Sequence, residues 1–388
     1  KYVPAPKVEI DKPFQMQITS LDYSSYLGAI GIGRIKRGTI QTNTPVVIIN
    51  AEGQERTGRV LQIFGYQGTD RQEVPMASAG EIVAICGIEN LKISDTLCDP
   101  NCIETLPALI VDEPTVSMTF QVNNSPFAGQ DGKFVTSRQI RERLQKELIH
   151  NVALRVEDTA DPDKFRVSGR GELHLSILIE TMRREGFELQ VSRPQVIFRE
   201  ENGHKTEPFE EVSLECPEGM SGTVIEKMGR RKADMKDMRV ENGTAYLQFE
   251  IPTRGLIGYR TEFMMDTRGQ GVLNTLFLGY RPFIGSIDSG PHGSLIAHET
   301  GESNTYGLLA AQERGQMFIG PGLKVYEGMV VGQNAKPEDL IVNVCKEKKL
   351  SNMRSKGDGV AEGLDTPRNM SLEEALEYLG DDELLEVT

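Results

Sequence analysis

The sequence lacks the features that mark several large classes of protein. No apolar stretch approaches the roughly 18 residues that a membrane-spanning helix needs, so no membrane partner is predicted. The five cysteines are scattered, form no CxxC pair, and have no second Cys or His pair nearby that would complete a zinc site. We interpret them as free thiols in a reducing cytosol and predict a cytoplasmic protein without a metal.

Motifs for nucleotide chemistry are also missing. There is no GxxxxGK[ST], and the nearest segment, residues 129–134 (GQDGKF), lacks the hydroxyl that would hold Mg²⁺. No glycine-rich turn between a strand and a helix is followed by an acid about twenty residues later, so a dinucleotide site is not predicted either. We therefore expect no cofactor and no enzymatic activity in this chain, and neither binding nor hydrolysis of GTP.

Histidine is scarce, with five residues in the chain. His292, His298, Glu299 and Glu302 form the only group that resembles metal ligands, and their spacing matches no known site. An enzyme that uses this group is a minor alternative, and no Ser-His-Asp or Cys-His arrangement follows from the spacing. The sequence starts with Lys1 rather than Met and has no apolar leader, so we expect it to begin inside a longer protein.

Charge is distributed unevenly around a formal net charge of −14. Residues 371–388 hold seven acids and no base, whereas six bases fall within residues 227–239 and five within residues 346–356. RNA responds to local potential rather than to net charge, so both basic segments are candidate RNA contacts. The bases of residues 138–146 and 183–184 lie on helix faces, where a solvated surface is the favoured interpretation and RNA contact is the alternative. The residues predicted to bind RNA are Lys346, Lys348, Lys349, Arg354, Lys356, Lys227, Arg230, Arg231, Lys232 and Lys236.

Apolar periodicity predicts an α+β protein of several domains. Residues 1–109 contain many short β-rich runs separated by turns, which is typical of a small closed β-barrel. Residues 110–200 alternate as strands and show two helical periods, in the order βαββαβ of a ferredoxin-like sandwich.

The same order repeats in residues 201–283, and we expect segments 110–200 and 205–282 to superpose. Residues 284–388 are rich in glycine and predict a mixed α/β C-terminal domain with a long basic loop at 346–363. Residues 346–363 have too few apolar side chains to offset their ordering entropy, so we expect residues 346–356 to be mobile in the free chain and ordered on RNA.

Several segments resemble the translational GTPases. Residues 24–28 (SSYLG) and 32–38 (IGRIKRG) resemble the second domain of these proteins. Residues 169–175 (GRGELHL) resemble the third domain of elongation factor G, and residues 252–260 (PTRGLIGYR) its fifth. Residues 299–303 (ETGES), 312–315 (QERG) and 344–350 (VCKEKKL) narrow the resemblance to the BipA/TypA family.

The resemblance covers essentially the whole chain and implies a ribosome-binding protein. It implies docking at the elongation-factor site on rRNA of both subunits and on ribosomal proteins, with the C-terminal domain reaching the A-site tRNA acceptor end. It also implies a monomer that acts in large-subunit assembly and in stress or cold adaptation. GTP and Mg²⁺ are implied only for the family's GTPase domain, whose P-loop does not occur in this sequence.

One departure limits the resemblance to elongation factor G. The connector at about residues 192–205 is too short for a tRNA-mimicking domain, so translocation is not implied. LepA shares that absence but differs in its C-terminal domain. The alternative from another class is a protein-interaction scaffold that does not bind ribosomes.

Overall fold

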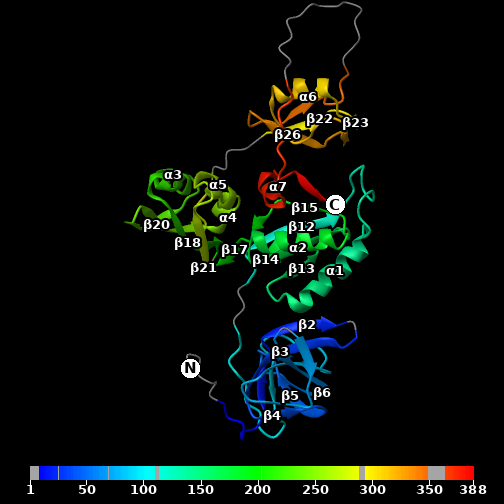
Figure 1. The fold of residues 1–388 in the computed structure, drawn as a ribbon, viewed down its shortest axis with the longest axis vertical. Coiled ribbons are helices and arrows are strands. Elements are labelled where there is room, and N and C mark those ends of the chain that lie inside the picture. The colour runs from blue at the N-terminus through cyan, green and yellow to red at the C-terminus, as the bar shows by residue number, and fades with distance from the viewer. Residues whose placement is uncertain are drawn as a thin grey trace, which may run out of the picture. The chain divides into compact units, whose positions relative to one another are not determined.

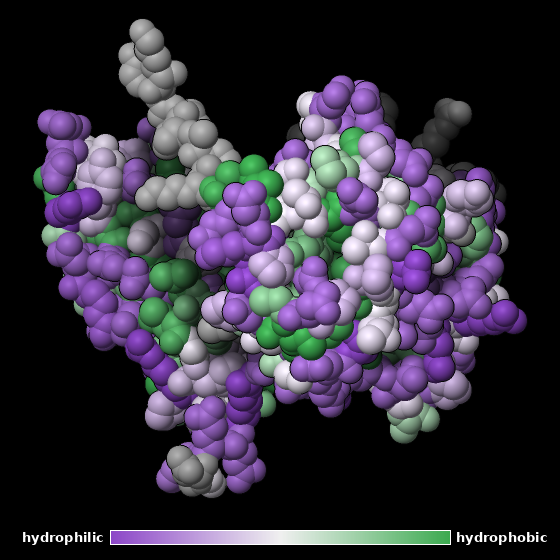
Figure 2. Space-filling view, turned by 90° about the horizontal axis from the view of Figure 1, so that it is seen from below, coloured by the Kyte–Doolittle hydropathy of each residue, from purple (hydrophilic) through white to green (hydrophobic). Residues whose placement is uncertain are grey.

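The computed structural model describes residues 8–347 and 363–388, except residues 25, 69, 110–112, 202 and 288–292. It is a multidomain α+β protein in which strands predominate. Two compact units separate by their contacts, the first holding Lys1–Pro114, Arg138–Asp158 and Ser168–Arg170, and the second Thr115–Ser137, Thr159–Val167 and Gly171–Thr388. No helix within the described ranges is long and apolar enough to span a membrane. Hydrophilic residues cover most of the face shown in Figure 2, with hydrophobic residues in patches between them.

The first unit is built around one antiparallel β-sheet of nine strands. Its order is β6-β5-β11-β1-β3-β10-β7-β8, with β2 also paired to β3, while β4 and β9 form a separate pair. The buried side chains of Met16, Ile35, Ile63 and Val83 belong to one core. Gly33 in β3 permits close packing, because a Cβ there would lie 2.1 Å from the backbone oxygen of Gln17. The strands are β1 Gln15–Gln17, β2 Ser20–Ser24, β3 Gly28–Arg37, β4 Thr39–Gln41, β5 Thr44–Ile49, β6 Glu55–Val60, β7 Gln62–Gln67, β8 Asp70–Glu73, β9 Met76–Ser78, β10 Ile82–Cys86 and β11 Thr96–Cys98.

The next segment contains the predicted alternation of strands and helices. Its elements are β12 Val116–Val122, α1 Ser137–His150, β13 Arg155–Asp158, β14 Lys164–Gly169, α2 Glu172–Arg184, β15 Leu189–Ser192, β16 Gln195–Val196 and β17 Arg199–Glu201. Leu175, Leu178, Ile179 and Met182 of α2 are buried, as their helical spacing predicts.

The strand β28 (Leu384–Val387) joins this part of the second unit from the far end of the sequence. It lies antiparallel to β15, with Leu189 opposite Val387, and β15 in turn pairs with β12. The predicted C-terminal domain at 284–388 is therefore not self-contained, because its last strand completes another sheet. The acidic composition of residues 371–388 concealed this strand.

A buried carboxylate organises the glycine-rich loop at 129–134. Glu188 has no exposed surface and accepts the backbone N–H groups of Gly129 at 2.7 Å and Gly132 at 2.9 Å, and the Asn123 amide at 2.8 Å. Burial alone would raise the pKa of Glu188, but these donors outweigh it and hold the pKa below its ordinary value. The loop amides that could cradle a phosphate are thus bonded to the protein's own carboxylate.

The repeat of the pattern forms a second sheet, with helices on one side of it (Figure 1). Its order is β17-β18-β20-β19, with β21 also paired to β18. Val224 and Met228 of α3 and Tyr259 and Phe263 of α5 pack on the buried strand residues. The elements are β18 His204–Pro217, a 3-10 turn Glu218–Met220, α3 Ser221–Arg230, β19 Asp234–Glu241, β20 Thr244–Pro252, α4 Thr253–Leu256, α5 Tyr259–Asp266 and β21 Val272–Pro282.

The remaining segment contains both strands and helices. A four-stranded sheet has the order β24-β26-β22-β27, in which β27 runs parallel to β22, and β23 pairs with β25. Helix α6 packs on this sheet through Leu308 and Ala311. The elements are β22 Ser294–Ala297, β23 Gly301–Glu302, α6 Thr305–Gln312, β24 Gly315–Met317, β25 Lys324–Val325, β26 Val330–Asn334, β27 Leu340–Val342 and α7 Leu372–Tyr378.

Candidate nucleic-acid interface

The first basic cluster lies at the end of α3, in the turn that follows, and on β19. Two of its members point inward. Lys227 Nζ lies 2.8 Å from carboxylate oxygens of both Glu262 and Asp266 on α5. Arg231 donates to the backbone oxygens of Gly255 at 2.9 Å and Ile257 at 3.0 Å, and pairs with Glu262 at 2.8 Å.

Three other members of this cluster, Arg230, Lys232 and Lys236, face outward. Arg230 pairs with Glu226 of the same helix, and Lys236 Nζ lies 2.6 Å from Asp234 and 3.0 Å from Glu250. Lys232 is exposed in the left-handed conformation with φ 64°, and no ion pair to it occurs within the described ranges. These three bases, rather than Lys227 and Arg231, can reach an external phosphate.

Local carboxylates fix the charge of the paired lysines. Burial would lower the pKa of Lys227, but hydrogen bonds with Asp266 and Glu262 raise it above its ordinary value. Hydrogen bonds with Asp234 and Glu250 likewise raise the pKa of Lys236. Both therefore carry a positive charge at neutral pH, although neighbouring acids offset much of it.

The second basic cluster starts at Lys346, which is exposed. Lys348, Lys349, Arg354 and Lys356 lie outside the described residues, as does the expected change in order of residues 346–356. The two ends of this segment are held by contacts with the rest of the domain.

Helix α6 holds both ends. At its N-terminus, the Asn304 amide donates to the backbone oxygen of Cys345 at 2.8 Å, and the Asn304 backbone N–H donates to Val344 at 3.0 Å. At its C-terminus, the Gln312 amide donates to the oxygen of Gly363 at 3.3 Å and accepts the N–H of Asp365 at 3.1 Å. The basic segment therefore leaves and rejoins the domain at opposite ends of one helix.

Two residues of α6 and its N-terminus, Gly307 and Asn304, are required by the local structure. Gly307 lies in α6, and a Cβ there would lie 2.4 Å from the backbone oxygen of Val344. Residue 307 must therefore be small for the chain before Lys346 to approach the helix so closely. Asn304 also caps α6, because its side chain accepts the N–H of Gly307 at 2.9 Å.

The motif at 252–260 also acts inside the domain. Arg254 pairs with Glu207, which is fully buried, and donates to the backbone oxygen of Gly285. Glu207 in turn accepts the N–H of Ile284 at 3.0 Å. Arg254 thus fixes the chain that leaves β21.

Residues 169–175 lead into α2 and include Glu172, a buried carboxyl group whose burial the sequence did not predict. Burial raises its pKa to about 7, and the nearby Glu377 carboxylate adds to that effect. The Gly258 N–H donates a hydrogen bond to the Glu172 carboxyl group, but the Oε1 atom of Glu172 is buried without a hydrogen-bond partner in the described chain.

The arginine-rich helix faces carry internal ion pairs. Arg138 pairs with Glu142, Arg141 with Asp158, and Arg143 with Glu147. Arg183 and Arg184 both pair with Glu180. His298 and Glu299 belong to no group of three or more possible metal ligands within the described chain, and His292 lies outside it.

Comparison with known proteins places three family models along this architecture. Residues 28–98 match elongation factor Tu domain 2, residues 204–289 the elongation factor G C-terminus, and residues 292–388 the TypA/BipA C-terminal domain. The chain therefore resembles the BipA/TypA family, whose own C-terminal domain model matches residues 292–388. The last match includes α6 and the basic segment between its two anchors.

Relatives in the BipA/TypA family align with all of this chain. Proteins named large ribosomal subunit assembly factor BipA are 55% identical in Haemophilus influenzae, 54% in Escherichia coli K12 and 51% in Synechocystis. The chain spans 63%, 64% and 65% of their respective lengths. A solved protein of Thermus thermophilus is 15% identical with a TM-score of 0.46, covering 71% of this chain and 56% of that one.

These matches correct one prediction. We expected no enzymatic activity, but the whole chain aligns at 51–55% identity with members of a family of translational GTPases. The absence of a P-loop concerns only the residues of this sequence, which span less than two thirds of the length of those relatives. It therefore does not support the statement that the protein is not an enzyme.

Proposed function

We propose that this chain is the ribosome-binding portion of a large-subunit assembly factor. The observation that carries the proposal is the 51–55% identity, across all of the chain, to proteins named for that role. The basic segment, whose two ends are anchored on α6, provides the means, because lysine and arginine side chains neutralise rRNA phosphates.

The proposal extends to the arrangement on the ribosome. The chain docks at the elongation-factor site, on rRNA of both subunits and on ribosomal proteins, as a cytoplasmic monomer. The C-terminal domain carries Lys346 and the bases after it toward the A-site tRNA acceptor end. In the whole protein, a GTPase domain with GTP and Mg²⁺ times release, and the activity serves assembly under stress or cold.

The proposal also divides the chain into four domains. In it, residues 1–109, which contain the nine-stranded sheet and the separate β4–β9 pair, correspond to the translation-factor barrel. The element order β12-α1-β13-β14-α2-β15 repeats as β18-α3-β19-β20-α4-α5-β21, which supports two ferredoxin-like sandwiches at 110–200 and 201–283. The proposal assigns residues 284–388 to the family-specific domain, although the last strand of that segment, β28, pairs with β15 of the preceding sheet.

Co-sedimentation of the chain with purified ribosomal subunits across a salt series tests the proposal. We expect binding to the large subunit that weakens steeply as salt rises, because phosphate contacts release counterions. Absence of binding at low salt would contradict it and would favour a protein scaffold that does not bind ribosomes.

A further inference from the structure

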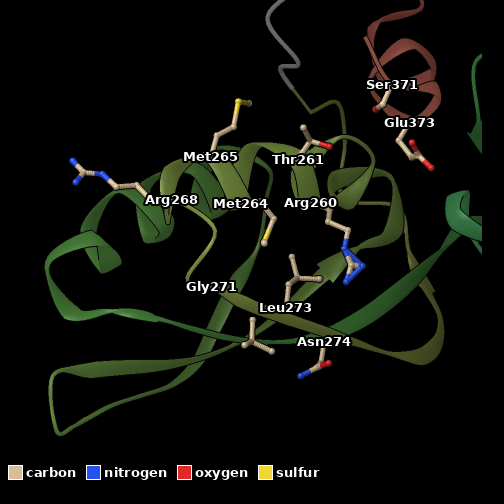
Figure 3. A pocket seen from close by; sticks show the side chains of 11 residues that line it. Arg260, Thr261, Met264, Met265, Arg268, Gly271, Leu273, Asn274, Ser371 and Glu373 are labelled. Carbon is tan, nitrogen blue, oxygen red and sulfur yellow. The ribbon is translucent and has the colours of Figure 1, made fainter. Parts of the chain in front are cut away.

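A groove unrelated to the predicted RNA contacts runs beside α5. Its volume is about 840 Å³, and the first turn of α7 closes one end. Figure 3 shows Met264, Arg260 and Leu273 converging between α5 and β21, while Met265 and Arg268 project outward from the helix. Ser371 and Glu373 of the α7 end complete the lining.

The groove exposes apolar side chains of both α5 and β21. Met264 is 39% exposed, Met265 64% and Val272 45%, although α5 already buries Tyr259 and Phe263 in the core. Methionine side chains adapt to varied apolar partners, and contiguous exposed apolar side chains mark docking surfaces. The groove is too open to enclose a small molecule on most sides, so it suits a segment of a macromolecule.

The charged side chains of the groove determine which net charge a docked segment should carry. The guanidinium groups of Arg260 and Arg268 make no ion pair or hydrogen bond with any described residue. The acids of the same helix, Glu262 and Asp266, are already bound to Lys227 and Arg231. Two unpaired arginines against one acid, Glu373, leave the groove positively charged.

The observations favour a protein partner over the other occupants. The chain's own basic segment at 346–356 would meet like charge at Arg260 and Arg268. Proteins that recognise single-stranded RNA stack its bases on aromatic side chains, and the residues that line this groove include no aromatic side chain; its floor is methionine, valine and leucine. A helix with apolar side chains at i, i+3 and i+4 fits such a floor.

We propose that the groove between α5, β21 and α7 docks an acidic amphipathic helix of a partner protein. Apolar side chains of that helix cover Met264, Val272 and Leu273, and its carboxylates pair with Arg260 and Arg268. This site is independent of ribosomal RNA binding, so the two proposals stand or fall separately.

Fluorescence polarisation with two designed peptides tests the groove. One labelled 18-residue helical peptide carries leucines along one face and glutamates elsewhere, and the second has every glutamate replaced by lysine. The full chain binds the acidic peptide at least about tenfold more tightly, because only its charges complement the arginines. Equal affinity for both peptides overturns the proposal.

Variants of groove residues test whether the acidic peptide binds in the groove. R260E with R268E reverses the preference in favour of the lysine peptide, and Met264→Asp weakens the acidic peptide about tenfold or more. The matched control is Arg230→Glu, a base on α3 outside the groove, which leaves peptide affinity unchanged. Circular dichroism verifies that each variant is folded, as expected for exposed positions. Unchanged affinity in the folded double variant overturns the proposal.

Competition with RNA decides between partner classes. An RNA hairpin added in excess leaves the acidic peptide bound if the groove is a protein site. Displacement of the peptide by the hairpin, together with loss of hairpin affinity in the R260E and R268E double variant, would make the groove a nucleic-acid site and overturn the proposal.

Discussion

Arg231 and Arg230 are neighbours in the sequence with opposite roles in the structure. Arg231 is 25% exposed and joins three acceptors, whereas Arg230 is 74% exposed and meets only Glu226. Composition alone placed both among candidate RNA contacts. What separates them is the turn of the chain after α3, which aims Arg231 at the backbone oxygens around residues 255–257.

Arg231→Lys tests this internal role while keeping the positive charge. Lysine lacks the planar fork that reaches Gly255, Ile257 and Glu262 together, so we expect a loss of about 1–3 kcal/mol in local stability. Native-state hydrogen exchange over residues 253–266 measures it. Arg230→Lys is the control and leaves exchange unchanged. Equal exchange in both variants would show that Arg231 does not hold the turn.

At the scale of elements, periodicity predicted most strands and helices. Alternation in residues 245–251 and the helical spacing of Leu175 to Met182 are physical consequences of one-sided burial, and both are confirmed. β28 was missed because strand pairing depends on a distant partner, β15, and because acids surround its short apolar run. The groove was missed because it combines α5, β21 and α7 from separate parts of the sequence.

Val387→Asp tests whether β28 stabilises the sheet. Val387 is 3% exposed and lies opposite Leu189, so a carboxylate there would be buried without a partner, at a cost of about 2–4 kcal/mol. We expect faster amide exchange across residues 189–192. Leu384→Asp, at an end of the strand that is 43% exposed, serves as the control with little effect. Unchanged protection in Val387→Asp would mean that β15 does not need this neighbour.

Glu172 lies where α2 and α7 pack together, and its raised pKa predicts that the stability of the fold depends on pH. Glu377, Glu373, Arg193 and the Gly258 N–H face its carboxyl, and burial raises its pKa to about 7. The unfolded pKa is about 4.3, so the stabilising contribution of the protonated form is present below that pH and is lost as pH rises through about 7.

Glu172→Gln should therefore stabilise the protein at pH 8 and flatten the stability curve between about pH 4 and 8, by roughly 1–3 kcal/mol. Urea unfolding at several pH values measures this. Glu180→Gln on the same helix is the control, because Arg183 and Arg184 hold the pKa of Glu180 at about 2, so that its carboxylate stays ionised in the folded protein across this range. Parallel curves for wild type and Glu172→Gln would contradict the assignment.

At the scale of the whole molecule, a net charge of −14 coexists with five bases within residues 346–356, which are separate in the sequence from the acids of residues 371–388. The acids of residues 371–388 lie partly within α7 and β28, where Ser371 and Glu374 form a capping box and Glu386 accepts from Ser125 at 2.8 Å. The two ends of the basic segment are anchored instead on α6. Sequence could locate the bases, but not that one helix holds both ends of the segment.

The last prediction follows from that separation of charge. Replacing Lys348, Lys349, Arg354 and Lys356 by Ala should weaken binding to ribosomes and flatten its salt dependence, by up to about 0.9 log units per log of salt for each lost phosphate contact. The fold should be unaffected, because the anchors Asn304 and Gln312 are retained. Co-sedimentation from low to high salt measures both quantities. The control replaces Lys227, whose charge is bound to Glu262 and Asp266, and should leave the slope unchanged. If the quadruple variant sediments like the parent at every salt concentration, these bases do not contact RNA, and binding must come from other surfaces such as that of Arg230, Lys232 and Lys236.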